Sequence, residues 1–342
     1  MPSPAQGASL EEMRALMARL PGPDLEAGTA AMAREGQLTK PAGALGRLEE
    51  LAHWMATWQG KHPPSANHPR TAVFVGNHGV AARGVSAYPA EVTQQMVQNF
   101  LNGGAAVNQL CRAVDADLRV YELALEEPTA DFTRGPAMTE EECARAMAYG
   151  MTAVETGVDL LAVGEMGIAN TTSAAALCCA IFGGEAEHWV GPGTGVEGEG
   201  LQRKLAAVAE GVVRHRAEST EPFDLLRRLG GREFAAVVGA IMAARQARVP
   251  VILDGYATTA AAAVLFVADP RALDHCIVGH RSAEPGHRRL LGKIGKPALL
   301  DLGMRLGEAS GATLAIAVLK AAVACHTGMA TFAEAGVSGK SD

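Results

Sequence analysis

A guanidinium and a carboxylate lie three residues apart in Ala298–Gly311 (ALLDLGMRLGEASG), where Arg305 precedes Glu308. The spacing suits one helix face, a loop that presents both side chains, or an ordinary i,i+3 ion pair. The neighbouring Gly307 and Gly311 are poor choices for an exposed structural helix. Because no Ser-His-Asp or Cys-His arrangement stands out elsewhere, a lone carboxylate acting as general base is the simplest catalytic hypothesis.

A second candidate segment is Gly164–Thr172 (GEMGIANTT), which follows an apolar run and precedes a helix pattern. Asn170, Thr171 or Thr172 suits a helix N-cap, and the free amides of the first helical turn can bind an anion. A phosphate site and an ordinary capped helix both fit this pattern. Glu165 would repel a phosphate, so we expect it to accept a hydrogen bond from a ribose hydroxyl.

The segment Gly191–Gly200 (GPGTGVEGEG) holds five glycines in ten residues, which lets the backbone approach a ligand closely. It contains neither a Walker A sequence nor GxGxxG. Lys204 lies one turn further along the next helix pattern. It suits a phosphate-binding cation and also an ordinary solvated helix face.

Two further loops carry polar residues. Asp254 in VILDGYATT is similar to one acid of the diphosphate-ribose loop of ordinary phosphoribosyltransferases, which normally has two adjacent acids, so a metal-diphosphate site is disfavoured. The loop HRSAEPGH has no recognisable zinc spacing, and we interpret its side chains as hydrogen-bonding groups at the rim of a site. Those side chains are His280, Ser282, Glu284 and His287.

The elements that position these residues follow an α/β pattern. Residues 9–58 have helical apolar spacing, Gly60–Arg70 is linker-like, and short apolar runs then alternate with amphipathic stretches, as in a parallel sheet. The loops after parallel strands meet at one edge of the sheet, so the polar residues should converge there. The predicted strands are Thr71–Val75, Leu118–Leu123, Leu160–Val163, Val249–Leu253 and His275–Val278, with Trp189–Val190 at the start or end of a sixth.

Composition excludes several classes of protein. The 342 residues are 48% hydrophobic and 20% charged, with 4% aromatics and a net charge of −7, which disfavours disorder and binding to nucleic acid or an acidic membrane. The six cysteines form no CxxC pair and are expected to be buried thiols. The N-terminus does not resemble a signal peptide, and apolar stretches such as Ala257–Ala268 are too short to span a bilayer. We therefore expect a cytoplasmic protein.

Seven collinear segments together resemble the nicotinate-nucleotide–dimethylbenzimidazole phosphoribosyltransferase family. Besides GEMGIANTT, GPGTGVEGEGL and HRSAEPGH, they are KPAGALGRLEELA, GNHGVAARGVSAYPAEVTQQMV, VPVILDGYATTAAA and LGMRLGEASGA. The resemblance implies transfer of phosphoribose from nicotinate mononucleotide to 5,6-dimethylbenzimidazole, with inversion at the anomeric carbon, in the assembly of the cobalamin nucleotide loop. It also implies a homodimer that needs no metal or cofactor.

The resemblance implies a role for each matching residue. Glu308 matches the general base, and Arg305 is a candidate for the nicotinate side of the base pocket. The rest of that pocket falls on Ser86, Tyr88 and Gln94. The nucleotide phosphate and ribose fall on Glu165, Gly167, Asn170, Thr171, Gly193, Thr194, Gly195 and Lys204.

The implied fold is a doubly wound, Rossmann-like parallel sheet with a smaller helical domain. We expect residues 1–70 to belong to the small domain, 71–300 to form the α/β domain, and 301–342 to carry the catalytic loop and helices that join the small domain. The chain departs from the family pattern at Asn77, Ala169 and Ala309, where Asp, Gly and Gly are usual. These departures leave the accepted base open.

Two other functions fit the residues less well. A metal-dependent transferase acting on the diphosphate sugar would require Mg²⁺ for turnover. A non-catalytic nucleotide-binding module would bind the nucleotide without releasing nicotinate, and would not need Glu308 as a base.

Overall fold

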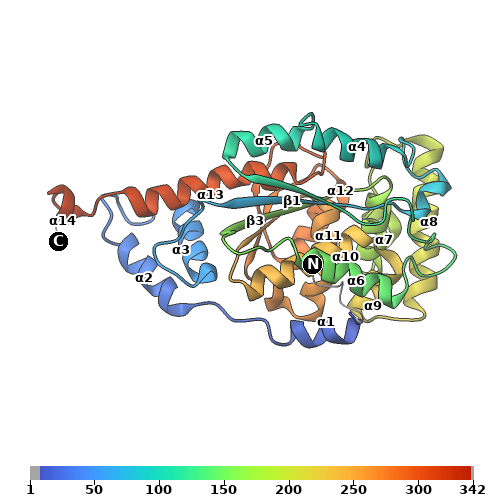
Figure 1. The fold of residues 1–342 in the computed structure, drawn as a ribbon, viewed down its shortest axis with the longest axis horizontal. Coiled ribbons are helices and arrows are strands. Elements are labelled where there is room, and N and C mark those ends of the chain that lie inside the picture. The colour runs from blue at the N-terminus through green and yellow to red at the C-terminus, as the bar shows by residue number, and fades with distance from the viewer. Residues whose placement is uncertain (1–7, 340–342) are drawn as a thin grey trace.

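The computed structural model describes residues 8–339, whose centre is a six-stranded sheet (Figure 1). The strands lie in the order β2-β1-β3-β4-β5-β6, and all neighbours are parallel. The chain winds from β1 out to β2 and then returns to β3 on the other side of β1, which confirms the predicted doubly wound sheet. The strands are β1 Pro69–Val75, β2 Asp117–Glu122, β3 Leu160–Met166, β4 Val251–Leu253, β5 Cys276–His280 and β6 Ala298–Leu300.

The sixth strand is not the one expected from the sequence. Trp189–Val190 lies outside the sheet, after a short 3₁₀ helix, η2 (Ala186–His188). The Trp189 indole donates to the Gly183 carbonyl at 2.9 Å, and the Trp189 carbonyl accepts the Tyr256 hydroxyl at 2.8 Å. These bonds tie the residue to helices, and β6 takes the edge position instead. The other five strands were placed correctly, with ends that differ from the prediction by at most three residues.

Helices cover both faces of the sheet. On one face lie α13, α5 and α4, and on the other α10 and α11 contact the strands while α6 and α7 pack outside them. These helices are α4 Val92–Leu101, α5 Ala106–Val114, α6 Glu140–Met151, α7 Asn170–Phe182, α10 Arg232–Gln246, α11 Tyr256–Ala268 and α13 Ser310–Gly328. The remaining helices of the α/β body are α8 Gly198–Arg216, α9 Pro222–Leu229, α12 Pro285–Ile294, η1 Gly79–Arg83 and η3 Pro270–Leu273.

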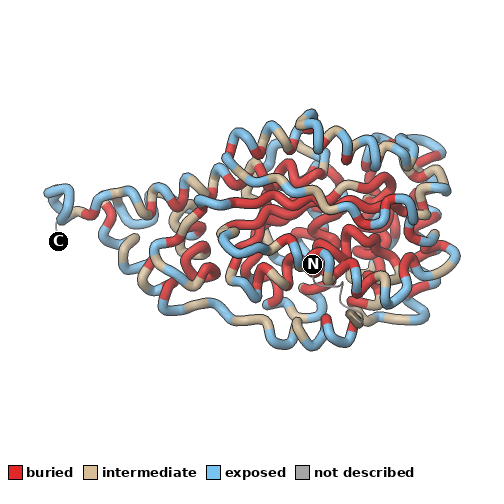
Figure 2. Tube along the Cα trace, viewed as in Figure 1, coloured by how far each residue is buried: buried red, intermediate tan, exposed pale blue. Residues whose placement is uncertain are grey.

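The inner strands β1, β3, β4 and β5 are buried on both sides, as Figure 2 shows for the centre of the sheet, whereas the edge strands β2 and β6 are partly exposed. Alternate side chains of β3 enter different clusters: Leu161 and Val163 face α10 and α11, whereas Leu160 and Ala162 face α13. Apolar residues are therefore favoured on both faces of these strands, which explains the runs without polar alternation.

One end of the molecule is built from both ends of the chain (Figure 1). Helices α2 (Leu25–Glu35) and α3 (Arg47–Gln59) pack together, α3 packs on α13, and Leu38 pairs with Thr331 just before α14 (Phe332–Ala335). Helix α1 (Leu10–Met17) lies apart from them, against α6. The proposed boundaries of a small domain stay a prediction.

Within residues 8–339, α13 is the one helix long and apolar enough to cross a membrane by length and composition. Its 19 residues are used inside the fold, where Ala312, Ile316 and Leu319 pack against the sheet and 44% of the apolar window is buried. All six cysteines are free thiols, and all except the partly exposed Cys325 are buried, as expected.

Candidate active site

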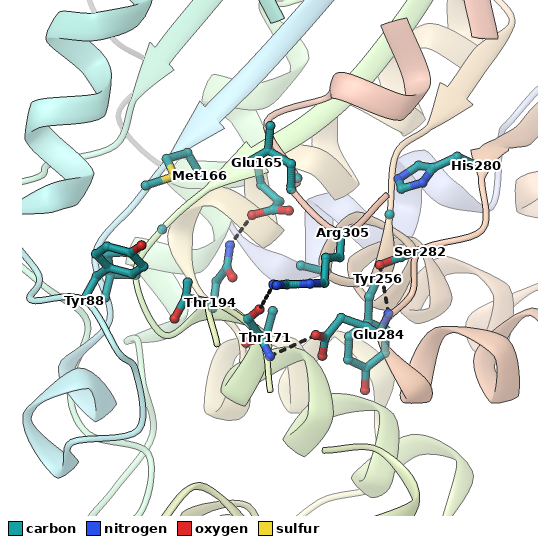
Figure 3. A pocket seen from close by; sticks show the side chains of 18 residues that line it. Tyr88, Glu165, Met166, Thr171, Thr194, Tyr256, His280, Ser282, Glu284 and Arg305 are labelled. Carbon is teal, nitrogen blue, oxygen red and sulfur yellow. Dashed lines mark hydrogen bonds between the residues drawn. The ribbon is translucent and has the colours of Figure 1, made fainter. Parts of the chain in front are cut away.

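A cavity of about 320 Å³ opens at the carboxyl edge of the sheet, where the winding reverses and where ligands bind in doubly wound folds. Its walls come from the loops after β3, β4 and β5, the glycine-rich segment before α8, and the segment after β6 (Figure 3). Eight of the residues predicted from the sequence line it. They are Tyr88, Glu165, Gly167, Asn170, Thr171, Gly193, Thr194 and Arg305.

Other predicted residues lie beside the cavity. Ser86 does not line the cavity itself, but its hydroxyl lies 3.1 Å from the hydroxyl of Thr194, which does. Gly195 follows in the same loop, at a φ of +105°. Gln94 is exposed on α4, whose buried face carries Thr93 instead, the hydroxyl of which accepts the Ile168 amide at 3.1 Å. The role of Gln94 in binding the acceptor base stays a prediction.

Lys204 is buried behind the residues proposed to bind phosphate, with 1% of its surface exposed. The interpretation of Lys204 as part of a solvated helix face is therefore wrong. Its ammonium donates to the Thr171 hydroxyl at 2.9 Å and to the Gly191 carbonyl at 2.8 Å. Burial lowers the pKa of Lys204 to about 8, although the carboxylate of Glu284 opposes this shift. The packing of α8 on α7 thus places a positive charge directly under the cavity wall.

Gly193 is held from two sides. Its amide donates to Glu284 Oε1 at 2.9 Å, and its carbonyl accepts from the Arg305 guanidinium at 3.0 Å. At its φ of +56° a Cβ would lie 2.6 Å from the Thr171 hydroxyl and 3.0 Å from the Lys204 ammonium. Only glycine fits there, and the loop is ordered by charged partners from two other segments.

Glu165 is the penultimate residue of β3, lines the cavity and is 5% exposed. The Asn170 amide group donates to its carboxyl. Burial, together with the negative charges of Asp254 and Glu233, raises the pKa of Glu165 well above its usual range. The raised pKa favours the protonated carboxyl, which can both donate to and accept from a sugar hydroxyl.

The start of α7 differs from the expectation. The N-cap position is occupied by Ala169 at a φ of +75°, without a side-chain cap, and not by Asn170, Thr171 or Thr172. The side chains of Asn170 and Thr171 are instead directed to Glu165 and Lys204. They organise the site and do not cap the helix.

Glu308 lies in a loop before α13, so Arg305 and Glu308 are presented by a loop and not by one face of a helix. Its φ is +61°, its amide donates to the Glu165 carbonyl at 3.0 Å, and 6% of the residue is exposed. Burial, reinforced by the charge of Asp254, raises the pKa of Glu308 to about 7. Gly307 lines the cavity next to it, and Arg305 bonds to Gly193 and forms no ion pair with Glu308 within the described residues.

The two alanines that replace family glycines both have left-handed backbones: Ala169 at φ +75° and Ala309 at φ +59°. Glycine adopts this conformation without steric cost, which is a physical reason for its use there. Asn77 is buried, and its amide group donates to the Leu125 carbonyl at 2.9 Å. The Asn77 side chain is thus bonded to a neighbouring loop.

Three of the four residues interpreted as hydrogen-bonding groups at the rim line the cavity, namely His280, Ser282 and Glu284, whereas His287 does not. Tyr256, which the sequence analysis did not single out, joins them on the wall opposite Tyr88 (Figure 3). Their position after apolar strands was the available signal. Asp254 is turned away toward α13, where it accepts the Ala312 amide at 2.9 Å. In residues 8–339 no group of three or more His, Cys, Asp or Glu side chains could hold a metal ion.

Comparison with known proteins gives consistent matches over nearly the whole chain. A family model described as phosphoribosyltransferase matches residues 20–337. The nicotinate-nucleotide–dimethylbenzimidazole phosphoribosyltransferases of Sinorhizobium medicae and Brucella anthropi are 59% and 58% identical over 98% of this chain and 99% of their own. A crystal structure of that enzyme from Thermus thermophilus is similar with a TM-score of 0.85 and 42% identity, over 93% of this chain and 100% of the other.

Proposed function

The chain belongs to the nicotinate-nucleotide–dimethylbenzimidazole phosphoribosyltransferase family, and from that premise we propose how its cavity performs the reaction. The enzyme transfers phosphoribose from nicotinate mononucleotide to 5,6-dimethylbenzimidazole and yields α-ribazole phosphate and nicotinate, a step in cobalamin biosynthesis. The roles of individual residues are the proposal.

We assign the phosphate and ribose of the nucleotide to the wall formed by the glycine-rich loop and the start of α7. Lys204 supplies the positive charge behind Thr171 and Gly193, and Gly167, Asn170, Thr194 and Gly195 complete this side. A buried ammonium bound to two neutral oxygens retains a donor for a phosphate oxygen. Glu165 receives a ribose hydroxyl.

Glu308 is the proposed general base, and the single observation that carries this role is its position: it is buried next to Gly307 of the cavity wall, with its amide bonded to the Glu165 carbonyl. Burial raises its pKa to about 7, which suits the role. As one benzimidazole nitrogen attacks the anomeric carbon, the proton on the other passes to Glu308. The bond to the pyridinium nitrogen breaks, and its electron pair leaves with nicotinate, whose ring becomes neutral. A base with a pKa near the working pH is ionised often enough and still basic enough for this transfer.

The acceptor base lies in the proposed pocket between Ser86, Tyr88, Gln94 and Arg305. Tyr88 is 54% exposed, and Leu302 and Leu306 beside Arg305 are 62% and 55% exposed. Such apolar side chains near a cavity suit contact with an aromatic substrate or with a second subunit. These side chains support a homodimer, which sedimentation equilibrium would test.

The free thiols support a reducing, cytoplasmic location, which cell fractionation would test.

The reaction is tested by measuring nicotinate release from nicotinate mononucleotide, with and without dimethylbenzimidazole, in the presence of EDTA. We expect release only with the base, and α-ribazole phosphate in equal amount. Turnover that requires Mg²⁺ and the diphosphate sugar would overturn the assignment. Tight nucleotide binding without nicotinate release would instead indicate a binding module.

A further inference from the structure

Asp254 is a fully buried carboxylate for which the proposed reaction gives no role. It follows β4, and its Oδ1 accepts the Ala312 amide in the first turn of α13 at 2.9 Å. The His280 Nε2 lies 3.5 Å from the same oxygen. The second oxygen, Oδ2, is buried and has no partner within residues 8–339.

Helix α13 needs this carboxylate because it has no cap of its own. Its N-cap residue is Ala309, at a φ of +59° and with no polar side chain. The amides of the first turn carry the positive end of the dipole of a 19-residue helix, which a carboxylate stabilises. A Cβ on Gly311 would lie 1.9 Å from the His280 ring, so this ring is packed against the same turn.

The residue two positions before α13 is Glu308. A group that fixes the start of the helix therefore also fixes the backbone of the proposed general base. We propose that Asp254 is a positioning residue for Glu308, which anchors the start of α13 and places a second negative charge beside the base. This inference rests on the role of Glu308 proposed above.

The electrostatic part of the inference depends on Asp254 being ionised. Burial raises the pKa of Asp254, and His280 with the backbone amides of Ala312, Gly311 and Gly255 limits this shift by stabilising the charged form. Its charge then raises the pKa of Glu308 beyond what burial alone does.

Other titratable groups face these two carboxylates. Glu165 from β3 is close to Asp254 and Glu308, and Glu233 from α10 is close to Glu165. On the other side of His280 lies His287 from α12, with ring centroids 6.5 Å apart. The cation of the loop, Arg305, bonds to Gly193. Asp254 is the carboxylate of this group that contacts α13 directly.

The test is the pH dependence of kcat/KM for nicotinate mononucleotide in Asp254→Asn. Asparagine keeps an oxygen for the Ala312 amide and removes the charge. With a Glu308 pKa of about 7, the wild-type value should be about tenfold lower at pH 6 than at pH 8. In the variant we expect the acidic limb to move to lower pH, and the loss at pH 6 to be clearly smaller.

Asp269→Asn is the matched control, since Asp269 accepts the Arg271 amide at the start of η3, before β5, at the opposite edge of the sheet. Its profile should equal that of the wild type. If the acidic limb of the kcat/KM profile of a folded Asp254→Asn enzyme were unshifted, the inference would be overturned. If Asp254→Asn does not fold, Asp254→Ser also lacks the charge and gives the same comparison. Full activity in Glu308→Gln would instead contradict the proposed base, so the two failures are distinguishable.

Discussion

Glu308 combines two properties that a residue with a purely structural role would not need: a left-handed backbone and a carboxyl whose pKa is raised by burial. We predict that Glu308→Ala and Glu308→Gln lower kcat about 10²–10⁴-fold, which is the usual contribution of a general base to the rate. The KM for the nucleotide should change little, because the phosphate side is intact. Steady-state kinetics would show this, with Glu141→Gln on the exposed face of α6 as control. Near-normal turnover would place the base elsewhere.

Lys204 is predicted to act on binding more than on turnover. Replacing it by Met keeps the stem and removes the ammonium, and a charge-assisted hydrogen bond is worth about 1.5–3 kcal/mol, so the KM for the nucleotide should rise about 10–150-fold. Because the pKa of Lys204 is about 8, the wild-type KM should also increase above pH 8, where the amine loses its charge.

The Lys204→Met enzyme should lack that alkaline increase. Lys293→Met removes an exposed lysine of α12 and serves as control. An unchanged KM in Lys204→Met would mean that the ammonium only orders the glycine-rich loop.

At the scale of elements, the sequence predicted what depends on local pattern. The inner strands β1, β3, β4 and β5 are buried on both faces and form apolar runs that were recognisable in the sequence. The edge strands β2 and β6 have no buried residue, and only β2 was predicted. The rotation of a helix depends on its neighbours. This is why Gln94 lies exposed while Thr93 is buried, and why the burial of Lys204 could not be decided from its spacing.

The contact between β3 and the loop before α13 gives a prediction for this packing. A Cβ on Gly164 would lie 2.2 Å from the Ala309 amide nitrogen and 2.3 Å from its Cα. Backbone atoms cannot move aside cheaply, so Gly164→Ala should lower the free energy of unfolding by at least about 2 kcal/mol and displace Glu308. Chemical denaturation together with kcat would measure both effects.

Gly292 is the matched control for that substitution. It is exposed within α12, and a Cβ added there would have no other atom within 4 Å. Gly292→Ala should raise stability by up to about 1 kcal/mol, because alanine is the better helix former. If Gly164→Ala behaved in the same way, the close approach of β3 to Ala309 would be wrong.

For the whole molecule, buried acidic and basic groups change the free energy of unfolding in opposite directions as the pH changes. Glu308 has a folded pKa of about 7, above its unfolded value, so the stability it contributes is lost as the pH rises through 7. His275 and His287 have pKa values lowered to about 3 by burial. Below pH 6.5 the unfolded chain binds protons that these folded rings do not accept, and their contribution falls as the pH is lowered. The two effects partly cancel, so a variant must be compared with the wild type at each pH.

His287 is suited to that comparison because its bonds require the neutral ring. Its Nδ1 accepts the Ser282 amide at 2.9 Å, and its Nε2 lies 3.2 Å from the Thr259 hydroxyl. In His287→Gln an uncharged amide oxygen can accept the same Ser282 bond, and no group remains that titrates at this position. We therefore expect the variant to have a lower Tm than the wild type at pH 8, and the difference to shrink as the pH falls from 6.5 to 5. His68→Gln, at an exposed histidine, is the matched control measured over the same pH range. A constant Tm difference for His287→Gln over this range would show that the folded protein accepts a proton at His287 as readily as the unfolded chain does.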